Sequence, residues 1–116
     1  MVPELRSLTT TASDDRAVPD DPTDCRVSVT AVIGPRGSPG EELFRFSVVT
    51  PIYLTHASDL PRWGRGMLIV DEFSWSTVER MVHRLLARFE AESWQQVAAL
   101  LCKELEWEFD GYEPSK

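Results

Sequence analysis

Two stretches of alternating apolar and polar residues, joined by a turn rich in glycine and proline, most constrain how this chain can fold. In CRVSVTAVI, residues 25–33, every second residue is apolar, and ELFRFSVVT, residues 42–50, resumes the alternation. Because side chains on a β-strand point alternately to its two faces, each stretch predicts a strand with one wet face. The intervening GPRGSPG is typical of a turn. The sequence therefore predicts a β-hairpin with a long loop.

Three other stretches also favour strands. The segment from Pro3 to Leu8 predicts an edge strand, where an early proline is tolerated. GMLIVDEF, residues 66–73, predicts a third main strand that is apolar enough to be central. At residues 105–110 acids alternate with large apolar residues, and a helix ending on those acids would be disfavoured by its dipole. We therefore expect a short final strand with Leu105, Trp107 and Phe109 inward and with Glu106, Glu108 and Asp110 outward.

Two helices are expected after the third main strand. Ser76 to Glu79 and Ser93 to Gln96 each match a capping box, in which side chains satisfy the unpaired N–H groups at a helix start. PIYLTHAS, residues 51–58, fits either one helical turn or a crossing loop. After each box, apolar residues recur at helical spacing and predict one buried stripe per helix. The stripes are Val78, Met81, Val82, Leu85, Leu86 and Phe89, and then Trp94, Val97, Ala98, Leu101 and Leu105.

This order of elements predicts an α+β fold, in which an antiparallel sheet of three to five strands carries two C-terminal helices packed on one face. The length of 116 residues fits a single domain, residues 1–116, that buries roughly 65% of the surface of the unfolded chain. Residues 9–24 are polar and rich in aspartate and proline, so a loop is expected there.

The cellular location is predicted from what the sequence lacks. The N-terminus has no basic start followed by an apolar stretch, so no signal peptide is expected. The strongest apolar runs, MLIV and VAALLC, are too short to cross a membrane. Cys25 and Cys102 have no metal-ligand spacing and are expected to be reduced thiols. The cytoplasm is therefore the expected location.

The charge balance points to a class of partner. The chain has 19 acidic residues against 12 lysines and arginines, a net charge of −7. That excess argues against nucleic acid as a ligand, because phosphate binding needs a basic surface. It suits a basic protein partner, although a merely soluble acidic surface has the same composition.

No pattern in the sequence predicts a catalytic, cofactor or metal site. His56 and His83 have no carboxylate or cysteine at metal-ligand spacing. GPRGSPG lacks the lysine of a phosphate-binding loop, and no nucleophile elbow is present. The segment from Arg62 to Arg65, RWGR, could stack on a base, but pairing of its arginines with nearby carboxylates is favoured in so acidic a chain.

The chain resembles the eighth immunity-protein family of bacterial polymorphic toxin systems over nearly its full length. The motifs are a Pro-Glu-Leu-Arg-Ser-Leu start, an Asp-Pro pair before the first long strand, IGPRGSPGEELFRFSVVTP, RGMLIVDEF, ESWQQVAALL and the closing WEFDGY. The match is weakest from Thr9 to Asp24. The resemblance implies an α+β fold without catalysis, and binding to the toxic domain of a protein encoded by a neighbouring gene. The toxins of such systems are often nucleases, and Trp94 and Trp107 match prominent family positions.

The closing acids are the first candidates for that contact, because a nuclease must present a basic surface to hold phosphate. Two other classes stay open: an adaptor of a secretion assembly, which would need an apolar patch, and a small enzyme using Asp71 and Glu72, which would need a pocket containing both. The candidate partner-binding residues are Glu106, Glu108 and Asp110 flanked by Glu104 and Tyr112, and in second place Asp71, Glu72 and Trp75.

Overall fold

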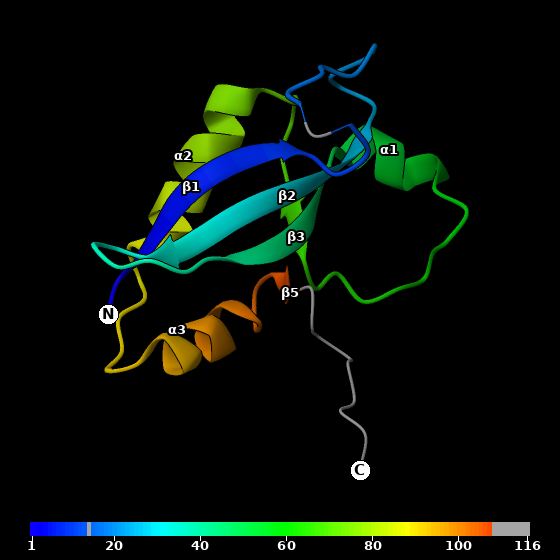
Figure 1. The fold of residues 1–116 in the computed structure, drawn as a ribbon. Coiled ribbons are helices and arrows are strands. Elements are labelled where there is room, and N and C mark those ends of the chain that lie inside the picture. The colour runs from blue at the N-terminus through cyan, green and yellow to red at the C-terminus, as the bar shows by residue number, and fades with distance from the viewer. Residues whose placement is uncertain (14, 108–116) are drawn as a thin grey trace.

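The computed structural model describes residues 1–13 and 15–107, and it has an α+β architecture, as predicted (Figure 1). A five-stranded sheet is covered by helices contributed mainly by the second half of the chain. The elements are, in order, β1 (Pro3–Thr10), β2 (Arg26–Pro35), β3 (Glu42–Val49), α1 (Pro51–His56), β4 (Met67–Ile69), α2 (Trp75–Leu86), α3 (Trp94–Leu101) and β5 (Glu106–Trp107).

The sheet has the strand order β1-β2-β3-β4, and β5 also pairs with β3. The predicted hairpin is confirmed, with Arg26 opposite Val49 and Ile33 opposite Glu42. The first strand is an edge strand, as expected, and β1, β2, β3 and β5 pair antiparallel. The sheet is mixed rather than wholly antiparallel, because β4 pairs parallel to β3. The crossover of residues 50–66 carries the chain back to the level of Ser47, near the end of β3, where β4 begins.

The expectation that GMLIVDEF forms a central strand is wrong. β4 has three residues and ends the strand order, pairing only with Ser47 to Val49 of β3. Ile69 keeps 61% of its surface exposed, whereas Val70 and Phe73 are buried. The apolar character of this stretch therefore comes partly from residues after the strand. The N–H of Phe73 donates to the carbonyl of Pro22 at 2.7 Å, which fixes the turn into α2.

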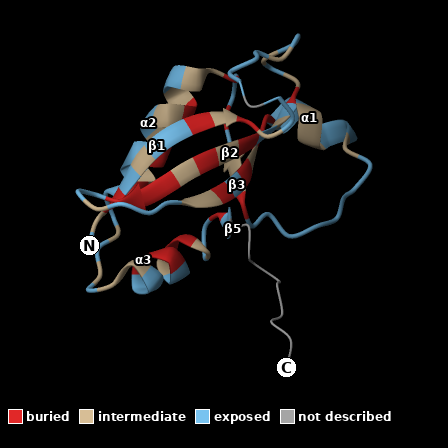
Figure 2. Cartoon of the chain, viewed as in Figure 1, coloured by how far each residue is buried: buried red, intermediate tan, exposed pale blue. Residues whose placement is uncertain are grey.

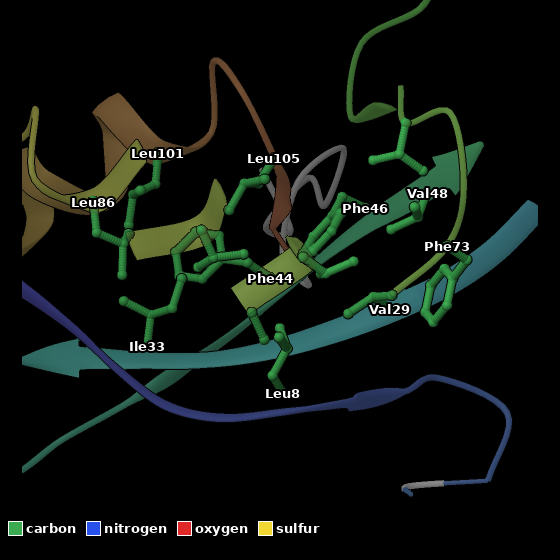
Figure 3. Close-up of a cluster of buried hydrophobic side chains, with 14 of the residues drawn as sticks. Leu8, Val29, Ile33, Phe44, Phe46, Val48, Phe73, Leu86, Leu101 and Leu105 are labelled. Carbon is green, nitrogen blue, oxygen red and sulfur yellow. The ribbon is translucent and has the colours of Figure 1, made fainter. Parts of the chain in front are cut away.

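One hydrophobic core joins the sheet to both C-terminal helices. α2 runs behind β1 and β2 in Figure 1, and α3 lies below β3. Figure 2 shows buried positions recurring along the strands, and Figure 3 shows side chains from strands, helices and the segment after α3 converging on Phe44. The fully buried part of the cluster includes Val29, Ile33, Phe44, Val78, Val97 and Leu101.

The helix start predicted from the sequence is observed for α3 but not for α2. At α3 the amide of Gln96 donates to Ser93 Oγ at 3.2 Å, and the Gln96 side chain accepts from the Ser93 amide, so the capping box is confirmed. α2 begins at Trp75, and its N-cap Ser74 makes no side-chain capping bond. The predicted box at Ser76 is wrong, because Ser76 lies inside the first turn and its hydroxyl bonds to that of Ser74.

The structure assigns residues 51–56 to a helix and shortens the polar loop predicted for residues 9–24. Residues 51–56 form a helix, α1, whose N-cap Thr50 accepts from the amide of Tyr53. Residues 9 and 10 belong to β1, so the polar loop predicted for residues 9–24 begins after Thr10. The guanidinium of Arg16 donates to the carbonyl of Leu8 at 3.0 Å, which holds this loop against the strand. None of the helices in the described part of the chain has the length and apolar character that a membrane span needs.

Candidate partner-binding surface

Carboxylates lie at both ends of β4, and they include four of the residues proposed from the sequence. Asp71 and Glu72 follow the strand after Val70 and are exposed. At the other end, the Glu106 side chain lies over Gly66, since a Cβ built on Gly66 would be 3.2 Å from the Cγ of Glu106. Glu104 is exposed and, like Gly66, lines a hollow beside β4. The fold therefore brings the described acids of the first group, Glu104 and Glu106, to the same edge of the sheet as Asp71 and Glu72.

Two hollows run along this edge between β4 and α2. The one near Glu104, of about 270 Å³, has apolar side chains from β4, α2 and Leu105 in its lining. The other, of about 580 Å³, extends past Asp71 and Glu72 to the first turns of α2. Both hollows are lined by Leu68 and Met81, so they lie side by side. We call them together the β4 groove.

The described carboxylates beside the β4 groove have no cationic partner. Among residues 1–13 and 15–107, Asp71, Glu72, Glu104 and Glu106 form no ion pair within 4.0 Å. Some acids elsewhere are paired: Asp59 contacts Arg62 at 2.7 Å, and Glu79 contacts Arg16 at 3.3 Å. Four uncompensated carboxylates flanking one strand attract a positively charged surface.

The acidity of the β4 groove is not uniform. Arg84 and Arg88 of the α2 side line the hollow near Glu104, so cations and a carboxylate meet there. Among the described residues, the lining of the larger hollow includes Asp71 and Glu72 and no lysine or arginine. The end of the groove that contains Asp71 and Glu72 is therefore its most strongly acidic part.

Trp75 makes intramolecular contacts rather than facing the groove. Its indole N–H donates to the carbonyl of Ala17 at 3.1 Å, and its ring packs edge-on against Phe73 with centroids 5.2 Å apart. The guanidinium of Arg16 lies 5.5 Å from the ring centroid, within the range of a cation–π contact. Trp75 thus links the start of α2 to Arg16 and Ala17 of the polar loop.

The remaining candidates, Glu108, Asp110 and Tyr112, lie outside the described residues, as does Phe109. The predicted final strand is confirmed for residues 106 and 107, which pair with Arg45 and Phe44 of β3. Leu105 is buried and Glu106 is exposed, in agreement with the predicted alternation.

Two exposed apolar residues near this edge were not proposed from the sequence as partner contacts. Trp63, on the crossover, keeps 91% of its surface exposed, and Ile69 of β4 keeps 61%. The signal for Trp63 was the RWGR segment, whose arginines are engaged within the chain: Arg62 with Asp59, and Arg65 with the carbonyl of Cys102. The expected pairing of Arg62 with a carboxylate is confirmed. Exposed tryptophan is enriched at the centres of protein interfaces.

The ionisable groups away from the groove are engaged in local contacts. His56 Nε2 lies 2.8 Å from Asp24, and His83 Nε2 lies 3.7 Å from Glu79. The hydrogen bond from Arg62 lowers the pKa of Asp59, and burial raises the pKa of the Cys25 thiol. Within the described ranges, no three His, Cys, Asp or Glu side chains gather closely enough to hold a metal ion.

One comparison with known proteins finds a match. The family model described as Immunity protein 8 matches residues 4–112, which is nearly the whole chain and includes every element of the fold except the first residue of β1. Neither the curated proteins nor the solved structures contain a match to this chain.

Proposed function

The chain belongs to Imm8, the family of Immunity protein 8, and on that premise we propose that it binds and neutralises a cognate toxin through the acidic β4 groove. The toxin is a nuclease-type effector of a bacterial polymorphic toxin system, encoded by a neighbouring gene. The protein acts in the cytoplasm of the producing cell, without a cofactor and without binding nucleic acid or membrane. Its oligomeric state is left open.

The observation that carries this proposal is the set of uncompensated carboxylates at the two ends of β4. Glu104 and Glu106 lie at its start, and Asp71 and Glu72 lie after its end. A nuclease holds phosphate with lysine and arginine, so its active surface is the kind of surface that these carboxylates attract. On the alternation predicted from the sequence, the proposed contact residues also include Glu108, Asp110 and Tyr112.

The two competing classes receive less support from the same groove. Asp71 and Glu72 do line one hollow, as an enzyme would require, but both are exposed, and the described part of its lining includes no histidine, cysteine or lysine. An adaptor would need an apolar patch, and the exposed Ile52, Leu60 and Trp63 lie on the crossover. A toxin can use the same patch as an aromatic anchor, so it does not favour an adaptor.

The test is co-purification with the neighbouring toxin, followed by association kinetics of charge variants. Asp71→Asn/Glu72→Gln and Glu104→Gln/Glu106→Gln each change the net charge from −7 to −5. Each should slow association at low salt by about tenfold, because steering by the protein's field is lost. At high salt the difference should shrink, because screening removes the same interaction.

A control variant separates local from overall charge. Glu4→Gln/Glu92→Gln also gives −5, and both residues are exposed and form no ion pair within the described ranges. Glu4 is on β1 at the opposite edge of the sheet from β4, and Glu92 is on the link between the C-terminal helices. An equal slowing by this control would show that net charge alone steers association. A toxin that does not co-purify with the parent protein would overturn the proposed function.

A further inference from the structure

β4 has one edge without a strand partner in the described part of the chain. The amide of Ser47 donates to the carbonyl of Gly66 at 2.8 Å, and the amide of Val70 donates to that of Val49 at 3.0 Å. Residues 66, 68 and 70 therefore direct their backbone groups toward β3. By the alternation of a β-strand, Met67 and Ile69 direct their N–H and C=O groups to the outer edge. Unpaired edge groups of this kind are ready to accept another strand.

The space beside that edge is shaped to receive one. The β4 groove follows β4 along its length and has apolar side chains on its inner side, including Leu68, Met81 and Leu85. Side chains of an added strand alternate between two faces. Every second side chain can therefore enter the groove while the backbone pairs with β4.

We propose that the toxin adds a strand to the outer edge of β4, pairing its backbone with Met67 and Ile69. This inference rests on the proposed function and specifies how the toxin is held. Strand addition takes its affinity from main-chain hydrogen bonds and its specificity from the pockets that alternate side chains fill. Ile69, which is 61% exposed in the free protein, becomes covered by the incoming strand.

The charges around β4 define the chemistry of the incoming strand. The residue that reaches Asp71 and Glu72 is a lysine or arginine, because the described lining of that hollow has two carboxylates and no lysine or arginine. At the other end, Arg84 and Arg88 stand beside Glu104, so a basic residue is less favoured there. The partner is thus an extended segment with apolar alternate positions and a cation at one end.

Amide hydrogen exchange of the protein, free and bound to the toxin, tests the inference. In the free protein the amides of Met67 and Ile69 should exchange quickly, and Leu68, whose N–H faces β3, should exchange slowly. Binding should slow exchange at Met67 and Ile69 by about tenfold or more, because each gains a hydrogen bond. Unchanged exchange at both amides in a formed complex would overturn the inference while leaving the proposed function intact.

A variant of the same edge gives a second readout. Ile69→Pro removes an N–H that makes no hydrogen bond within the sheet, and edge strands tolerate proline. The affinity of this variant for the toxin should fall by about tenfold, because one intermolecular hydrogen bond is lost. The control Ile69→Val keeps the N–H and should bind like the parent protein. Equal affinity of the proline and valine variants would contradict strand addition.

Two further results, loss of toxin binding by the parent protein and dimerisation of the free protein, can be distinguished from the results above. Complete loss of binding by the parent protein would overturn the proposed function together with the inference. A free protein that is dimeric, with both amides already protected, would show that a second copy of the chain occupies this edge, and it would also overturn the inference.

Discussion

Thr50 is fully buried, and its hydroxyl holds two segments together. It accepts from the amide of Cys25 at 3.0 Å and from the amide of Tyr53 at the start of α1. Thr50→Val keeps the shape but leaves both amides without this acceptor, so it should lower the free energy of unfolding by about 1–3 kcal/mol. Thr50→Ser keeps the hydroxyl and loses one buried methyl group, about 0.8 kcal/mol. Urea unfolding of both variants checks the order, and a serine variant less stable than the valine variant would contradict it.

The two cysteines are not joined to each other by a disulfide, and their surroundings differ. Burial raises the pKa of Cys25, and the nearby charges of Asp21 and Asp24 raise it further, so at neutral pH its thiol stays protonated. Cys102 is only half-buried. Because the thiolate is the reactive form, Cys25 should react with a thiol reagent more slowly than Cys102 in the folded protein. Both should react rapidly once the chain is denatured, and mass spectrometry of timed samples would detect either order.

Single residues of the candidate surface were predictable from charge, but their surroundings were not. The acids of the final row stand out in the sequence because no basic residue lies among residues 104–110. Asp71 and Glu72 stand out because neither of their sequence neighbours is basic. The role of Trp75 depended on Ala17 and Arg16, which are distant in sequence and approach only through folding. The exposure of Trp63 likewise depends on the absence of a neighbouring element, which local sequence does not encode.

At the scale of the element, Ser93, which caps α3, and Ser76, which was predicted to cap α2 but does not, provide a matched pair. Ser93→Ala removes the side-chain bond to the amide of Gln96 and should lower stability by about 1 kcal/mol. Ser76→Ala removes a hydroxyl that contacts only Ser74 Oγ and should change stability by less than about 0.5 kcal/mol. Thermal unfolding monitored by circular dichroism measures both. Equal losses would show that Ser76 also supports the start of α2.

Periodicity predicted the type of these elements better than their position. The stripes of α2 and α3 were readable because helical spacing is a local property, and Val78, Val82 and Leu86 are indeed buried. The start of α2 was misplaced because the bond between Phe73 and Pro22, which fixes where the chain turns, is a long-range contact. The apolar run of β4 could not reveal an edge strand, because edge or centre depends on what lies beside it.

At the scale of the whole molecule, one core implies one unfolding event. The buried cluster draws on four strands or their flanking residues, on α2, on α3 and on Leu105. Heat or urea should therefore produce a single transition that coincides by far-ultraviolet circular dichroism and by tryptophan fluorescence. Phe44→Ala, at the centre of the cluster, should lower the free energy of unfolding by about 3–5 kcal/mol. Two separate transitions would contradict the prediction of a single domain.

The crossover between β3 and β4 can vary in sequence and length with little effect on stability. α1 contributes no buried residue, and most of the segment that follows it is exposed (Figure 2). A glycine-serine insertion between Trp63 and Gly64 should scarcely change the melting temperature, because lengthening a surface loop costs only a few tenths of a kcal/mol. Substitutions in this crossover can therefore accumulate without weakening the core, so the sequence of the segment can vary while the scaffold stays the same.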